Sequence, residues 1–258
     1  MAYVYRAIDR QSNGPVAIKV LMSRLADDAE SVARLRREAQ MAMKLTHPNC
    51  CGLLGYGEAG GLPYLVMPFL EGETLSTRQN RVGPLTVSAA ISILIQLCRG
   101  LQHAHDAGIL HRDLKPENVM LVPDRGVERA VVMDFGLAKE RIMGGELSRL
   151  TATGIVLGTP EFMSPEQIRG KDIDQRSDIY SLGILAFELV TGELPFDGAN
   201  AQETMLNHLT GRPRRLRTVR AELPEALDQI IARSLKLDPA DRFPTMTAFA
   251  EALGTIDT

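Results

Sequence analysis

The distribution of apolar positions divides the chain into two parts. Up to about residue 70, short β-branched and aromatic runs alternate with polar turns, and four of these runs predict strands, at residues 2–8, 16–21, 51–56 and 64–67. The first two runs flank the polar segment 9–14, which predicts a hairpin turn. Between the second and third runs, residues 29–44 have helical spacing until His47-Pro48-Asn49 ends it. We therefore expect a small antiparallel sheet with one helix.

The remainder of the chain, from Thr86 onward, has the apolar spacing of helices. Thr86 is suited to an N-cap, and apolar residues between 87 and 101 share one face until Gly108 ends this helix. Residues 177–191 are apolar nearly all round, which predicts a buried central helix. Three further helices are predicted, at residues 201–209, 224–235 and 245–253. The boundary between the two parts is expected near residues 67–72.

Composition and charge narrow the class of protein only a little. The chain has 258 residues, enough for one large domain or two packed lobes, and its 45% hydrophobic and 24% charged residues are typical of a globular protein. A formal net charge of −3 does not favour nucleic acid or an anionic membrane as a partner. No run approaches the ~20 apolar residues that span a bilayer, and no basic-then-apolar leader opens the chain. We expect a soluble protein without a membrane segment.

The cysteines indicate a reducing compartment. Cys50, Cys51 and Cys98 are odd in number and cannot all pair with one another. The adjacent Cys50 and Cys51 also lack the spacing of a metal site. We therefore expect reduced thiols and a cytoplasmic location.

Four short motifs carry the candidate chemistry, and their order along the chain matters as much as their residues. They are Val16-Ala17-Ile18-Lys19, the eight residues 111–118 (HRDLKPEN), Asp134-Phe135-Gly136 after a β-branched run, and Ser164-Pro165-Glu166. Together they resemble the signature of the eukaryotic-type (Hanks-type) serine/threonine protein kinase family, in the style of its bacterial members. An eight-residue match such as 111–118 is much more specific than either tripeptide alone.

The resemblance assigns roles in phosphoryl transfer to residues of two motifs. Asp113 matches the aspartate that orients the acceptor hydroxyl and accepts its proton. Lys115 is typical of serine/threonine kinases and would neutralise charge on the transferring phosphate. Asn118 and Asp134 would hold Mg²⁺, or Mn²⁺, because hard dications prefer oxygen ligands. Arg112 would pair with a phosphate on the activation segment.

The resemblance also places an ATP site between the two parts of the chain. Lys19 would contact the α- and β-phosphates, with Glu38 of the following helix as its ion-pair partner. A slot for the adenine is implied by residues of several segments: Val4, Ala17, Met67, Pro68, Leu70 and Met120. Plain core packing explains Val4 and Met120 equally well when each is taken alone.

Residues 134–166 correspond to the activation segment and its approach to the protein acceptor. Thr151 and Thr153 resemble the doubly phosphorylated stretch of bacterial members, so we expect autophosphorylation there, and the alternative is exposed hydroxyls with no role. Thr159 would line the acceptor site and bond Asp113. Two structural contacts are also implied, a buried ion pair of Glu166 with Arg242 and an anchor for the catalytic-loop backbone at Asp178.

The match is incomplete at the start of the chain. The family's glycine-rich loop over the phosphates is represented only by its tail, with Ala2 at the position of the last glycine, and the first strand is missing. Two explanations stay open. Either the true start lies upstream of Met1, or the truncation is real and the protein binds nucleotide weakly.

The sequence therefore predicts an α+β, two-lobed protein kinase fold. A single domain would occupy residues 1–258, with an amino-terminal lobe at 1–70 that lacks its first strand and a mostly helical carboxy-terminal lobe at 71–258. The expected reaction is transfer of the γ-phosphoryl group of ATP to Ser and Thr hydroxyls of proteins, with self-association for autophosphorylation. A pseudokinase scaffold and a small-molecule kinase are the rivals. The acceptor-groove motifs at 158–160 and 164–166 argue against the second rival.

Overall fold

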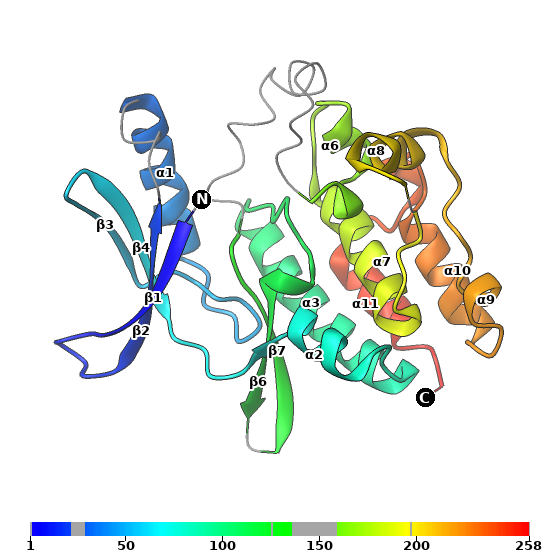
Figure 1. Ribbon diagram of the computed structural model, residues 1–258, viewed down its shortest axis with the longest axis horizontal. Helices are drawn as coiled ribbons and strands as arrows, with labels where there is room; N and C mark the ends of the chain where they lie inside the picture. The colour runs from blue at the N-terminus through cyan, green and yellow to red at the C-terminus, as the bar shows by residue number, and fades with distance from the viewer. Residues whose placement is uncertain (1, 22–28, 125, 136–158, 197, 258) are drawn as a thin grey trace.

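The computed structural model describes residues 2–21, 29–124, 126–135, 159–196 and 198–257. Two lobes lie side by side in Figure 1, a sheet with one helix at the amino-terminal end and a larger, mainly helical lobe that follows. The α+β two-lobed architecture expected from the sequence is confirmed.

The amino-terminal lobe is built on a four-stranded antiparallel sheet with the order β1-β2-β4-β3. Its strands are β1 (Ala2–Ile8), β2 (Pro15–Leu21), β3 (Gly55–Ala59) and β4 (Leu62–Pro68). In the turn of the predicted hairpin, the Asp9 carboxylate accepts hydrogen bonds from the backbone N–H groups of Gln11 and Ser12. The register sets Val4 opposite Lys19, and Ala17 opposite Met67.

The strand predicted at residues 51–56 is wrong in its position. β3 begins at Gly55, because the Gly60-Gly61 turn, with φ of 58° and 75°, fixes its pairing with β4. Residues 50 and 51 lie against the other lobe, where the Cys51 N–H donates to the Val132 carbonyl at 2.8 Å. An apolar run alone does not identify which strand will receive its hydrogen bonds.

Helix α1 (Ala29–Ala42) covers one face of this sheet. Ala39 and Ala42 are buried in a cluster with Leu53 and Leu65, against which Met67 packs. The small side chains of α1 allow close approach of the helix to the sheet.

The carboxy-terminal lobe is formed by helices packed around α7. The longer helices are α2 (Leu75–Val82), α3 (Val87–Asp106), α7 (Gln175–Thr191), α8 (Ala201–Thr210), α10 (Glu225–Ser234) and α11 (Met246–Leu253). Two short helices complete the set, α6 (Pro165–Ile168) and α9 (Leu216–Val219). Thr86 caps α3 by accepting from Ala89 N–H, as the sequence predicts.

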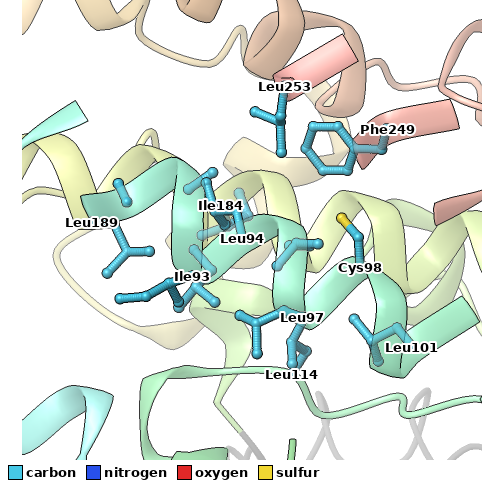
Figure 2. Packing of buried hydrophobic residues seen from close by; sticks show 14 of the residues in the cluster. Ile93, Leu94, Leu97, Cys98, Leu101, Leu114, Ile184, Leu189, Phe249 and Leu253 are labelled. Atoms are coloured by element: carbon cyan, nitrogen blue, oxygen red, sulfur yellow. The ribbon is translucent and has the colours of Figure 1, made fainter. Parts of the chain in front are cut away.

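Helix α7 is the buried centre of the lobe. Figure 2 shows Leu94 of α3 beside Ile184 of α7, Leu97 beside Leu114, and Phe249 of α11 on the side of α3 that carries Cys98. Most residues from 177 to 191 are buried, which agrees with the apolar character of this segment in the sequence. This core includes Leu114 and so anchors the loop at residues 111–118 that follows α3.

A three-stranded antiparallel sheet, β5-β6-β7, was not predicted from the sequence. It consists of β5 (Glu73–Thr74), β6 (Val119–Asp124) and β7 (Val127–Val132). The β6–β7 hairpin carries one predicted motif at each end. The 3-10 helix η1 (Pro116–Asn118) leads directly into β6, and Asp134 follows two residues after β7.

Candidate active site

The loop at residues 111–115 is fixed by a buried carboxylate on α7. Asp178 accepts hydrogen bonds from the backbone N–H groups of His111 and Arg112, both at 2.9 Å. His105 Nε2 lies 2.7 Å from Asp178 Oδ2, and the exposed fractions of these two side chains are 1% and 2%. One acidic side chain of α7 therefore fixes the backbone of this loop through two hydrogen bonds.

The environment of Asp178 favours its ionised form. Burial alone would raise the pKa of this carboxyl, but the hydrogen bond with His105 and the charges and N–H groups around it lower the pKa overall. The carboxylate thus remains an acceptor for both backbone donors. This arrangement holds Arg112 in the left-handed region at φ 63°, a strained conformation for a non-glycine residue.

The side chains of the predicted catalytic loop converge around Asp113. Asn118 Nδ2 donates to the Asp113 carbonyl at 2.8 Å and lies 3.3 Å from its Oδ2. Lys115 Nζ donates to Thr159 Oγ1 at 2.8 Å, so the acceptor-side threonine lies beside the same loop. The expected bond from Thr159 to Asp113 stays a prediction.

The second motif approaches this loop from β7. His111 Nε2 donates to the Met133 carbonyl at 2.8 Å, and the Phe135 ring meets the His111 ring edge-on at 5.2 Å. Asp134, in between, adopts a φ of 57°. Its Oδ1 lies 2.7 Å from Lys19 Nζ, which brings the strand lysine of one lobe to the aspartate of the other. The predicted Lys19–Glu38 pair stays a prediction.

The oxygen atoms in this region fit a hard divalent cation. Both hydrogen bonds of the Asn118 amide described above use its nitrogen, so its oxygen and the Asp134 carboxylate are the expected ligands of a cation. Among the described residues, no group of three or more His, Cys, Asp or Glu side chains could hold a metal ion. A site with two protein ligands suits Mg²⁺, which usually takes one or two side chains and completes its shell with water and phosphate oxygens.

The predicted adenine slot is brought together in part. Met67, Leu70 and Met120 all pack against one buried cluster formed by Cys51, Val122 and Val131. Ala17 pairs with Met67 in the sheet, and Pro68 ends β4. Val4 lies on β1 with 63% of its surface exposed, so it is outside the packed core of the described residues.

The segment that contains Glu166, which is expected to adjoin the protein acceptor, is attached to the carboxy-terminal lobe by a buried ion pair. Arg242 Nη1 and Nη2 contact the two carboxylate oxygens of Glu166 at 2.7 and 2.9 Å. Burial alone would raise the pKa of Glu166, but the Arg242 guanidinium and the Ser177 hydroxyl lower it overall. Glu166 lies in the first turn of helix α6, whose N-cap residue Ser164 forms a capping box with Gln167.

Sequence reasoning missed several residues that support the site. His105 holds Asp178, and Gln167 Nε2 donates to the Arg112 carbonyl at 2.9 Å, which ties α6 to the catalytic loop. The position of His105, on the helix predicted after Thr86 and six residues before His111, was a usable signal for its role. Thr151 and Thr153 lie outside the described residues.

Glu188, a residue of α7, was also missed. Burial raises its pKa to about 7, and the nearby carboxylates of Glu117 and Glu161 add to the effect. The Oε2 atoms of Glu188 and Glu161 are buried and have no hydrogen-bond partner within the described part of the protein. Only the fold brings these three acids, from the catalytic loop, the acceptor segment and α7, close to one another.

Comparison with known proteins agrees with this geometry. Residues 1–253 match the family model of the protein kinase domain. The chain is 39% identical over its whole length to the serine/threonine-protein kinase pkn3 of Myxococcus xanthus, covering 48% of that protein. It is 38% identical over 95% of its length to PknB of Mycolicibacterium smegmatis, covering 39% of that protein. The chain thus spans less than half the length of these relatives.

A solved structure supports the same assignment. The kinase domain of Mycobacterium tuberculosis PknI superposes with a TM-score of 0.77 and 30% identity, covering 98% of this chain and 90% of that one. Proteins of this family use ATP and divalent metal ions and act on protein substrates. No helix among the described residues is long and apolar enough to cross a membrane. The match over nearly all of its length shows that this chain belongs to the protein kinase domain family.

Proposed function

We propose that this chain transfers the γ-phosphoryl group of ATP to serine and threonine hydroxyls of proteins. The observation that carries the proposal is the convergence at one place of Asp113, Lys115 and Asn118 with the Lys19–Asp134 pair. Phosphoryl transfer needs little covalent chemistry from the protein, since it depends on positioning and on charge. These five side chains supply both.

Each residue has a distinct role in the proposed reaction. The Asp113 carboxylate orients the acceptor hydroxyl and takes its proton as the bond to phosphorus forms. Lys115, held beside Thr159, faces the charge that develops on the transferred group. Asn118 and Asp134 would hold Mg²⁺ or Mn²⁺, which would draw off phosphate charge. Lys19 would bind the α- and β-phosphates, and Glu38 would orient it.

The wider proposal concerns partners and location. Thr151 and Thr153 would be phosphorylated by a second copy of the chain, and Arg112 would then pair with the new phosphate. Cytoplasmic location is supported by the three cysteines, all free and buried.

Phosphate incorporation from γ-labelled ATP into a general protein substrate tests the reaction. We expect label on serine and threonine with Mg²⁺ present, and a loss of at least roughly 100-fold in Asp113→Asn and Lys19→Met. Asp124→Asn and Lys236→Met change exposed side chains of the same types and should keep wild-type activity. Equal incorporation by the wild type and Asp113→Asn would remove the proposed reaction, and nucleotide binding without transfer would favour a pseudokinase.

A further inference from the structure

Two histidines lie close together where the turn after α1 (residues 43–50) meets helix α3. His47 belongs to the turn and His103 to the last part of α3, and their ring centroids lie 5.4 Å apart at an interplanar angle of 30°. Both side chains are partly buried. Neither ring belongs to the residues proposed for phosphoryl transfer, and from the sequence alone both are most simply helix-end or packing histidines.

The hydrogen bonds of these rings require that both be neutral. His47 Nδ1 accepts from the Asn49 N–H at 3.1 Å, and His103 Nε2 accepts from the Thr46 N–H at 3.4 Å. A protonated imidazole has N–H groups at both nitrogens and accepts at neither. Protonation of either ring therefore turns an acceptor toward a backbone N–H into a second donor.

The surrounding charges also oppose protonation. Burial lowers the pKa of His47, and the neighbouring His103 and Arg99 of α3 lower it further. From β7, Arg129 Nη1 donates to the Pro48 carbonyl at 2.6 Å. The thiols of Cys50 and Cys51, with pKa values raised to about 12, stay neutral and supply no counter-charge.

The same turn joins the two lobes. Asn49 Nδ2 donates to the Ala130 carbonyl at 2.7 Å, and Val132 N–H donates to the Asn49 carbonyl at 2.9 Å. The turn therefore fixes the end of α1 to the strand β7, and β7 leads within two residues to Asp134. A change in the turn is transmitted directly to the strand that carries a candidate metal ligand.

We propose that His47 and His103 form a proton-sensitive joint between the lobes. When both rings are neutral, the turn is docked on α3 and β7. Uptake of a proton by one ring removes a backbone hydrogen bond and places a positive charge beside the other ring and Arg99. The turn then loosens, and the positions of α1 and Asp134 become less well fixed. Regulation of activity by this joint rests on the proposed function, whereas its titration does not.

Proton NMR titration of the imidazoles in the full chain tests the joint without reference to catalysis. Since a positive charge on His103 opposes protonation of His47, His103→Gln should raise the pKa of His47 by roughly 0.5 to 1 units. Arg99→Gln should also raise the pKa of His47. Lys236→Gln, which removes an exposed positive charge elsewhere, should leave the pKa of His47 unchanged. If removing His103 shifts the pKa of His47 by less than roughly 0.2 units, the joint is refuted.

Thermal unfolding gives a second, independent reading. Because the pKa of His47 is lowered on folding, the unfolded chain takes up its proton first, so stability falls as pH drops below the unfolded value of about 6.5. We expect the drop in Tm between pH 7.5 and 5.5 to be smaller in the His47→Gln/His103→Gln double variant than in the wild type. An equal drop in both would overturn the proposal. If the chain proves active, the ratio of transfer rates at the two pH values should change in the same direction.

Discussion

Replacement of Arg242 by methionine should destabilise the protein more than any exposed charge change. The guanidinium is fully buried, makes two bonds to Glu166, and donates to the carbonyls of Lys236 and Arg176 at 2.8 and 2.9 Å. Methionine fills much of the volume but leaves a buried carboxylate without its guanidinium partner, with the Ser177 hydroxyl and the Glu166 backbone N–H still donating to it. Breaking a buried pair in this way costs about 3–5 kcal/mol, and each orphaned carbonyl adds about 1 kcal/mol.

Urea unfolding followed by far-ultraviolet circular dichroism measures this loss of unfolding free energy. In thermal unfolding, Tm should fall by roughly 10 to 20 °C. The double variant Glu166→Leu/Arg242→Met removes the stranded charge, so it should be more stable than Arg242→Met alone. Arg217→Met, which breaks an exposed 3.5 Å contact with Glu225, should cost less than about 0.5 kcal/mol. A loss below about 1 kcal/mol in Arg242→Met, or a double variant less stable than the single one, would refute the reasoning.

The pH dependence of this pair has a definite sign. The pKa of Glu166 is lowered on folding, so its contribution is present above the unfolded value of about 4.5. It is lost as the pH falls through the folded value. The stability advantage of the wild type over Arg242→Met should therefore shrink in acid, below about pH 4.5.

Three further predictions concern other parts of the protein. The pKa of Glu188 is raised to about 7 on folding, so the contribution of this residue to stability should fall as pH rises from about 4.5 to 7. Glu188→Gln should therefore be more stable than the wild type by on the order of 1–3 kcal/mol at pH 8, with little gain at pH 4. Denaturant titration at both pH values would measure the difference. Leu97→Ala removes a fully buried side chain of α3, beside Leu114 in the core, and should cost about 2–5 kcal/mol in the same assay, whereas exposed Leu237→Ala should cost little. Asn118→Ala should weaken Mg²⁺ binding, seen as a higher Mg²⁺ concentration for half-maximal transfer rate. An unchanged half-saturating concentration would count against the role of Asn118 as a ligand.

Much of the fold could be predicted because its apolar periodicity is strong. The segment 177–191 is apolar all round and becomes the buried α7, and Thr86 caps α3 as its side chain and position indicate. The β5-β6-β7 sheet could not be predicted in the same way, since β5 has two residues and its pairing with β6 depends on contacts far apart in the sequence. Strand pairing is decided by tertiary structure, which periodicity does not encode.

The candidate site divides along a similar line. Asp113, Asn118 and Asp134 could be found because their motifs are short, ordered and contiguous. The hydrogen bond from Gln167 to the Arg112 carbonyl and the approach of Glu161 to Glu188 could not, because only the packed helices bring these residues together. The motif residues were visible in the sequence, and their supports required the fold.

The docking of the turn after α1 on β7 has a consequence for synthesis of the protein. Asn49 and Ala130, which it bonds, are 81 residues apart in the chain. At translation rates of about 5–20 residues per second, the turn waits roughly 4 to 16 s for its partner strand to be made. During that interval Leu45 and Cys50, which follow α1 in the turn, have no core to enter, because both are buried in the cluster of the second lobe. The first lobe is thus made first but completed late, which gives a chaperone or a neighbouring nascent chain a defined window in which to bind it.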